Sequence, residues 1–336
     1  MIEPLGLIQP QKIESDSEHI IIRPVGDVHR GNPHFDEKYW ESMLLEIQNT
    51  PNMYWVGCGD YIENANKKQK HGGVYGQTMG PRAQVEAIAA DLAPIAPNAW
   101  GMIGGNHDHW SLMDTDLDPA EWIAEKIGVA EKYQQDGLVI RIETGARTRP
   151  GGRRGQRGGD SPCRYTIYLT HGASGSAAVG GKATALQKGA DVVVADLYIG
   201  AHVHTELICR DLIFTPTWHD RVSCAYRERW YVNTGSLLHY TPYARTRRYR
   251  PQPVGIPISI LDCTRELVDA SLRLTLEGEV ADVPRPRWPA GRLPRGGVRR
   301  ADLFIDWPRG GWASKGGEQA NGGDDGGDLL GHRSSF

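Results

Sequence analysis

The stretch HIIIRPVGDVH, residues 19 to 29, runs from apolar, β-branched residues straight into a short polar motif. Its apolar part, 19–26, is typical of a buried strand. Asp27 bounds this strand, and His29 follows two residues later. A carboxylate and an imidazole this close together in a turn can both face one metal ion.

Further polar motifs stand directly after apolar runs in the same way. They are, with the preceding run in parentheses, Gly59-Asp60 (53–58), Gly105-Asn106-His107-Asp108 (99–103), His171-Gly172 (165–170) and Gly200-Ala201-His202-Val203-His204 (192–199). Open α/β folds bind ligands in the loops at the carboxyl ends of their strands. We therefore expect the polar side chains of all these motifs to converge on one site.

The order of the remaining elements indicates the fold class. Further helices are expected at 36–48, 82–93 and 119–127, and further strands at 138–143, 207–214, 229–232, 256–261 and 270–276. In the first helix, Trp40, Leu44 and Ile47 recur at helical spacing behind Asp36, a suitable N-cap residue. Helices alternate with strands in the first half and strands dominate the second, which predicts an α/β (α+β) fold with two sheets.

The composition excludes several classes of protein. The chain has 336 residues and a net charge of −3, so any nucleic-acid contact must come from a local basic patch. The five cysteines are widely spaced and form no C-x-x-C pair, which indicates reduced, structural thiols. No apolar run approaches the ~20 residues of a membrane span. We expect a soluble, cytoplasmic protein without a membrane partner, and the sequence leaves its oligomeric state open.

Composition also suggests the domain boundaries. We expect a catalytic domain over 18–280, preceded by an N-terminal extension over 1–17. Within it, the insertion 145–160 holds five arginines and six glycines and is expected to be a basic loop with little to bury. The region 281–336 is rich in proline, glycine and charged residues, which predicts a disordered tail.

The motifs offer mixed nitrogen and oxygen ligands. Such a set suits manganese, iron or zinc better than magnesium or calcium, and no cysteine falls in a motif, which argues against a structural zinc site. Asp60 has two carboxylate oxygens and can bridge two ions. Two divalent ions about 3.5–4 Å apart convert a bridging water to hydroxide and bind phosphate oxygens. We expect two divalent cofactor ions, manganese first, with iron or zinc as alternatives.

A leaving alkoxide also needs a proton. His107 is next to Asn106 but is not needed as a ligand, so we expect it to act as the general acid. A carboxylate should orient its imidazole, and the candidates in the sequence are Glu63 and Asp108.

These motifs resemble the signature of the calcineurin-like metallophosphoesterases, which reads D-x-H, G-D, G-N-H-D/E, H and G-H-x-H. The resemblance extends from Gly26 to His204, about half of the chain. It implies a four-layer αββα sandwich of two mixed β-sheets flanked by helices. It also implies one metal on Asp27, His29, Asp60 and His204, and a second on Asp60, Asn106, His171 and His202. Asn233-Thr234-Gly235-Ser236 resembles a turn that shapes the site in many members.

Two positions depart from the protein Ser/Thr phosphatase branch of this family. Asn64 and Gly104 stand where that branch has phosphate-binding arginines. Neither side chain can make a bidentate contact with phosphate. The pattern is closer to bacterial and phage members, including nucleases of double-strand-break repair.

The sequence thus predicts a metal-dependent phosphoric ester hydrolase. The expected substrate is a phosphodiester, with DNA or RNA as candidates through the arginine-rich segments 145–160 and 240–250. Alternatives are a small-molecule phosphatase or nucleotide diesterase and, from another class, a non-catalytic metal-binding scaffold or DNA-binding protein.

Overall fold

The computed structural model describes residues 5–8, 19–67, 74–146, 162–216, 224–246, 248–263 and 267–272, all of which belong to one unit, Met1–Ala281. Most of the predicted basic insertion, 147–160, and the predicted tail, 281–336, lie outside the described residues. Of the predicted extension 1–17, residues 5–8 are described. In the described part of the chain, no helix is long and apolar enough to cross a membrane.

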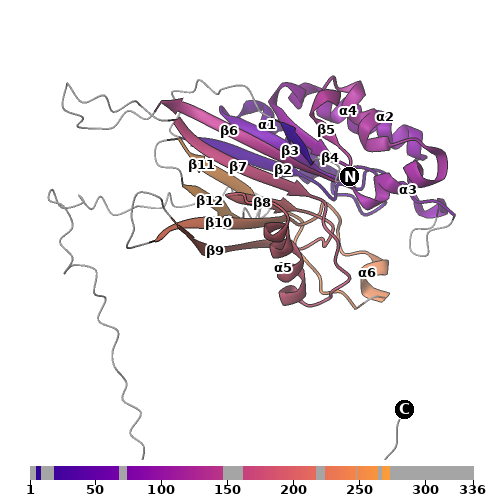
Figure 1. The fold of residues 1–336 in the computed structure, drawn as a ribbon. Helices are drawn as coiled ribbons and strands as arrows, with labels where there is room; N and C mark the ends of the chain where they lie inside the picture. The colour runs from indigo at the N-terminus through magenta and orange to yellow at the C-terminus, as the bar shows by residue number, and fades with distance from the viewer. Residues whose placement is uncertain are drawn as a thin grey trace, which may run out of the picture. The chain divides into compact units, whose positions relative to one another are not determined.

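The described strands form two mixed sheets (Figure 1). The first has the order β1 (Gly6–Ile8), β6 (Gly137–Ala146), β7 (Pro162–Thr170), β8 (Leu197–Gly200), β10 (Cys224–Thr234) and β9 (Glu206–Pro216). The second has the order β12 (Val268–Ser271), β11 (Ile258–Asp262), β2 (His19–Val25), β3 (Met53–Cys58), β4 (Ala99–Ile103) and β5 (Tyr133–Gln134).

Parallel pairing brings the strand ends that carry the polar motifs together. β2, β3 and β4 run parallel, with Val25 beside Gly57 and Cys58 beside Ile103. β7, β8 and β10 are also parallel to one another. Because parallel strands end at the same edge of a sheet, each sheet gathers its motifs at one edge.

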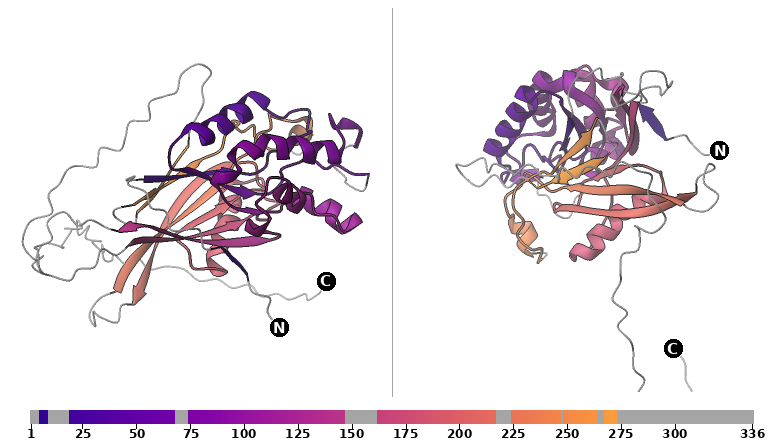
Figure 2. Two further views of the ribbon diagram at one scale, coloured as in Figure 1. Left: turned by 90° about the horizontal axis from the view of Figure 1, so that it is seen from above. Right: turned by 90° about the vertical axis from the view of Figure 1, so that its left-hand side faces the viewer.

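The described helices flank the two sheets, and most of them cover the outer face of one sheet (Figure 2). They are α1 (Glu37–Asn49), α2 (Pro81–Leu92), α3 (Asn106–Thr115), α4 (Pro119–Lys126), α5 (Val179–Gln187) and α6 (Pro242–Thr246). As predicted, Asp36 caps α1, accepting a hydrogen bond from the Tyr39 N–H at 3.0 Å. Asp118 caps α4 in the same way through the Ala120 N–H.

Three apolar clusters hold the layers together. One packs α1, α2 and α4 on the outer face of the second sheet and includes the buried rings of Trp40 and Trp55. The second fills the space between the sheets, where Ile22 and Val56 are in the same cluster as Ile167 and further residues of β6, β7 and β8. The third lies under α5. Helix, sheet, sheet and helix therefore form four layers, which confirms the predicted αββα sandwich.

Several elements differ from the prediction, and α5, α6 and β5 were not expected. The strand expected at 192–199 is shorter, because Val192 and Val194 are each 66% exposed and precede β8. Helix α3 was not predicted, since only Asp108 on it is buried and it carries no apolar stripe. Part of the expected N-terminal extension forms β1, which pairs in parallel with β6.

Candidate metal centre

The motif residues adopt an unusual backbone conformation. Asp27, His29, Asp60, His202 and His204 have φ angles of 49°, 52°, 54°, 70° and 48°. Non-glycine residues seldom occupy this left-handed region, and such residues cluster at functional sites. The turns are tied to one another, since the Asp27 N–H donates to Gly59 O at 3.1 Å and the His29 N–H to Asp60 O at 3.0 Å.

One group of ligand atoms comes from the first, second and last motifs. The Nε2 atoms of His29 and His204 are 3.1 Å apart, and His204 Nε2 is 3.6 Å from Asp27 Oδ1. Two nitrogens that bind one ion at about 2.1 Å lie roughly 3 Å apart, so this spacing suits a shared metal. Asp27 Oδ1 is buried and has no hydrogen-bond partner among the described residues, which leaves a lone pair for an ion.

A second group lies beside the first. Asn106 Oδ1 is 3.0 Å from His171 Nε2 and 2.6 Å from His202 Nδ1. His171 Nδ1 lies 2.7 Å from the Cys58 carbonyl, so it is the nitrogen that donates to that oxygen. This hydrogen bond fixes the tautomer and leaves Nε2 as a ligand atom.

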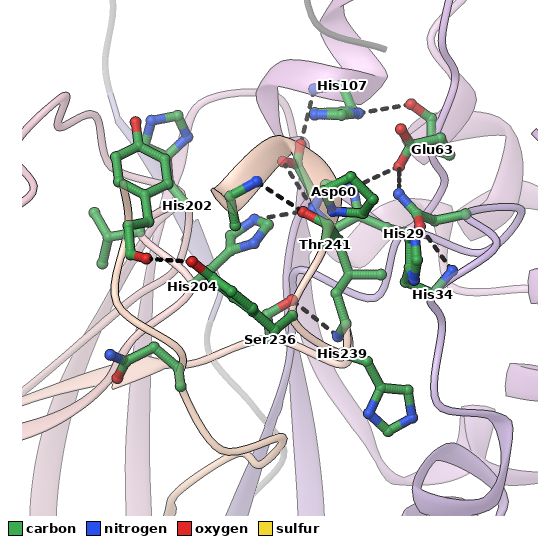
Figure 3. Close-up of a pocket in the computed structure, with 18 of the residues that line it drawn as sticks. His29, His34, Asp60, Glu63, His107, His202, His204, Ser236, His239 and Thr241 are labelled. Carbon is green, nitrogen blue, oxygen red and sulfur yellow. Dashed lines mark hydrogen bonds and ion pairs between the residues drawn. The ribbon is translucent and has the colours of Figure 1, made fainter. Parts of the chain in front are cut away.

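Asp60 belongs to both groups. Its Oδ2 is 3.8 Å from His29 Nε2 and 3.3 Å from His171 Nε2. Its Oδ1 accepts a hydrogen bond from the His107 N–H at 2.8 Å. Figure 3 shows Asp60 between Glu63 on one side and His204 on the other. The structure therefore brings together all seven residues that the sequence proposed as ligands, with one carboxylate shared.

The expected orientation of His107 by a carboxylate is wrong. His107 Nδ1 instead lies 2.6 Å from the backbone carbonyl of Glu63. The Glu63 carboxylate is 3.3 Å from His29 Nδ1 and accepts a hydrogen bond from Asn32 Nδ2 at 2.9 Å. Asp108 Oδ2 accepts from the N–H groups of Asp60 and Gly105. Glu63 and Asp108 thus hold the ligand-bearing turns, and a backbone carbonyl holds His107.

Asn64, which stands where the protein Ser/Thr phosphatases have a phosphate-binding arginine, forms structural hydrogen bonds. It is 2% exposed, its Nδ2 donates to His107 O at 2.6 Å, and its Oδ1 accepts from Ser111 Oγ at 2.9 Å. Asn64 therefore fixes the start of α3 and does not reach for a ligand.

The turn after β10 supports Asp27. Ser236 Oγ donates to Asp27 O at 3.1 Å, and Thr234 Oγ1 lies 3.4 Å from Asp27 Oδ2. This is the shaping role that the Asn233-Thr234-Gly235-Ser236 motif suggested.

The buried charges of the site perturb one another. Burial acts to lower the pKa of His29, but the hydrogen bond to Glu63 and the charge of Asp60 raise it to about 9. Burial also acts to lower the pKa of His171, but the charge of Asp60 and the hydrogen bond to it raise this pKa to about 10. Burial raises the pKa of Asp27. Without a cation, this site must bind protons to balance its carboxylates.

A pocket of about 490 Å³ opens above these residues. His29, Asp60, His107, His202 and His204 line it (Figure 3), as does Asn106. Its walls include Trp110 of α3 and these residues after β10: Leu238, His239, Tyr240, Thr241, Pro242, Ala244, Tyr249, Arg250, Gln252 and Pro253. Trp110 was not predicted as a site residue, because helix α3 was not predicted. Its position one helical turn after His107 could have indicated that the two rings lie on the same face of a helix.

Gly105→Ala is expected to destabilise the protein by about 1–3 kcal/mol, the usual cost of overpacking. A Cβ atom at Gly105 would overlap Oδ1 and the backbone nitrogen of Asp60, which the surrounding hydrogen bonds keep in place. Urea denaturation of the purified variant measures the loss. Gly80→Ala is the matched control, since a Cβ there meets no atom within 4 Å. Equal losses in both variants would show that the turn at Gly105 is not tightly packed.

The sequence matches no protein-family profile and no curated protein sequence. Among solved structures, it is similar to a metallophosphoesterase from Sphaerobacter thermophilus, at 14% identity and a TM-score of 0.31, covering 75% of this chain and 88% of that one. It is also similar to Vps29 complexed with Zn²⁺ from Entamoeba histolytica, at 12% identity and a TM-score of 0.31, covering 75% and 98%. A third is the calcineurin-like phosphoesterase YfkN from Bacillus subtilis, at 12% identity and a TM-score of 0.27, covering 79% and 88%.

Proposed function

We propose that this protein is a phosphoester hydrolase that uses two divalent metal ions. The observation that carries the proposal is the sharing of Asp60 Oδ2 between two groups of ligand atoms. Asp27, His29, Asp60 and His204 would hold one ion. Asp60, Asn106, His171 and His202 would hold the other.

The residues present fit such ions. The unpartnered, buried Oδ1 of Asp27 would be stabilised by a cation, because a buried carboxylate oxygen without a partner is costly. Imidazole nitrogens mixed with carboxylate and amide oxygens favour manganese, iron or zinc over calcium or magnesium. We put manganese first. When bound, the ions supply an activated water and neutralise charge on the phosphate oxygens.

His107 is the residue that would protonate the leaving oxygen. Its ring lines the pocket, and its Nδ1 is engaged by the Glu63 carbonyl, so Nε2 is the nitrogen that can pass a proton to a ligand. Burial lowers the pKa of His107, although the charge of Asp60 opposes this. Asp60 also accepts a hydrogen bond from the His107 N–H at the start of α3. This contact fixes the position of His107 relative to the metal ligands.

The charge of the pocket favours a diester over a monoester. Among the described residues that line it, the cationic side chains other than histidine are Lys182 and Arg250. Lys182 Nζ already donates to Val203 O at 3.0 Å and to Thr205 Oγ1. Beyond the ions, a monoester dianion would find Arg250 but no second uncommitted cation among the described lining residues to balance its second charge, whereas a diester carries one charge.

The proposal is tested by hydrolysis assays on the purified full chain with added Mn²⁺. We expect turnover of bis(4-nitrophenyl) phosphate, slower turnover of 4-nitrophenyl phosphate, and loss of both with EDTA. Faster monoester turnover would indicate the small-molecule phosphatase. Tight Mn²⁺ binding without turnover of any ester would contradict the hydrolase and support the scaffold alternative.

Metal binding should release protons and strengthen as pH rises. With a pKa of about 9 for His29 and about 10 for His171, both imidazoles are protonated at pH 7 in the metal-free protein and must lose those protons to become ligands. Titration calorimetry in buffers of different ionisation enthalpy should therefore report release of at least about two protons at pH 7, since the Asp27 carboxyl, with a pKa of about 7, also loses part of a proton. Uptake of protons, or an affinity that falls between pH 6 and pH 8, would contradict this account.

A further inference from the structure

One wall of the pocket is a loop, 237–254, whose ends are joined by the bridge between Ser236 and Gly255. Inside the loop, Tyr240 OH donates to Tyr249 O at 2.8 Å. The loop is also anchored outside itself, since the His239 N–H donates to His34 O at 2.9 Å. These contacts anchor the loop beside the site.

This loop is basic. Residues 237–255 include four arginines and no acidic residue. Arg245, Arg248 and Arg250 are exposed, and no carboxylate in the described ranges pairs with them. By contrast, Arg227 and Arg229 of β10 lie beside Asp196 and Asp211. Arg250 lines the pocket, and Arg245 and Arg248 are exposed on the same loop.

Another wall carries an aromatic platform. Trp110 follows His107 by one turn of α3, and their ring centroids are 3.9 Å apart. Both rings line the pocket. A leaving group that takes its proton from His107 must therefore pass beside the Trp110 ring.

We propose that this pocket binds one strand of a nucleic acid, with a base stacked on Trp110 and neighbouring phosphates on Arg250, Arg248 and Arg245. The inference rests on the proposed phosphodiester hydrolysis. A small diester ends next to the scissile phosphate, whereas a polynucleotide carries further phosphates that can meet the unpaired arginines. A base in a duplex is stacked on both faces, so only an unpaired base can stack on Trp110.

The first test measures binding separately from cleavage. Fluorescence anisotropy with a labelled single-stranded DNA oligonucleotide, in EDTA, compares the full chain with the triple variant Arg245→Gln, Arg248→Gln, Arg250→Gln. Each lost phosphate contact lowers the salt slope of single-strand binding by about 0.7, so we expect a decrease of about 2 for the triple variant. Arg141→Gln, an exposed arginine on β6, is the matched control and should bind as the unmodified chain does. An unchanged salt slope in the triple variant would overturn the inference.

The second test concerns stacking. Trp110→Ala should weaken oligonucleotide binding about tenfold, and Trp110→Phe should restore most of it, because a planar ring is what stacks. Binding of duplex DNA as tight as that of the single strand, or an equal loss in both variants, would overturn this part.

The outcomes also separate this inference from the proposed function. With Mn²⁺, the ratio of kcat/KM for the oligonucleotide to that for bis(4-nitrophenyl) phosphate should fall about tenfold or more in the triple variant. If the small diester is cleaved but this ratio and the binding are unchanged, the inference fails and the hydrolase stands. If no ester is cleaved, the proposed function itself fails.

Discussion

Asp60→Asn is expected to reduce metal-dependent diester hydrolysis by more than about 100-fold, since even residues behind the ligands of metal sites contribute 10–100-fold. Asp60 Oδ2 is the atom shared by both ligand groups. An asparagine keeps an oxygen that can accept from the His107 N–H, so the fold of the turn should survive. What is lost is the negative charge and the second oxygen that joins two ions.

The measurements are hydrolysis of bis(4-nitrophenyl) phosphate with Mn²⁺ and the metal content of the protein by mass spectrometry. We expect two ions per unmodified chain and at most one per variant chain. Asp191→Asn, at an exposed carboxylate outside the pocket lining, is the matched control. Two ions and full activity in Asp60→Asn would contradict the shared-ligand arrangement.

His107→Gln should separate proton transfer from metal binding. General acid catalysis contributes about 10²–10⁴-fold, so we expect a loss of that size with an alkyl leaving group. The loss should be much smaller with a 4-nitrophenyl leaving group, which departs readily without a proton. The metal content should stay unchanged, because His107 is not in either ligand group.

His109→Gln is the control for this variant. It lies on the same helix, its side chain is 3.4 Å from Gln135, and it is not part of the pocket lining. We expect it to keep both activities. A loss in His107→Gln that is the same for both leaving groups would show that His107 positions the substrate and does not donate the proton.

The convergence of the ligands could be predicted from the sequence because it depends on local patterns. An apolar run predicts a strand, and a polar motif directly after it must lie at the strand's carboxyl end. Asp27, Asp60 and His171 are each placed in this way. The shared role of Asp60 was likewise inferable, because a carboxylate can bridge two ions, although the structure places one oxygen, Oδ2, beside both ligand groups.

Other features of the site had no sequence signal. The partner of His107 Nδ1 is a backbone carbonyl, that of Glu63, and every residue has one. The carboxylate of Glu63 instead contacts His29 and Asn32. Asn32 is 31 positions away from Glu63 in the sequence. Pairing of β1 with β6 is similarly non-local and depends on the tertiary fold.

The central claim is that two cations bind side by side on these residues. Crystals of the full chain grown with Mn²⁺, with diffraction data collected at an energy where manganese scatters anomalously, test it directly. We predict two anomalous peaks, one beside His29 and His204 and one beside His171 and His202, both in contact with Asp60. One peak, or none at Asp60, in a protein that still hydrolyses phosphodiesters would contradict the account.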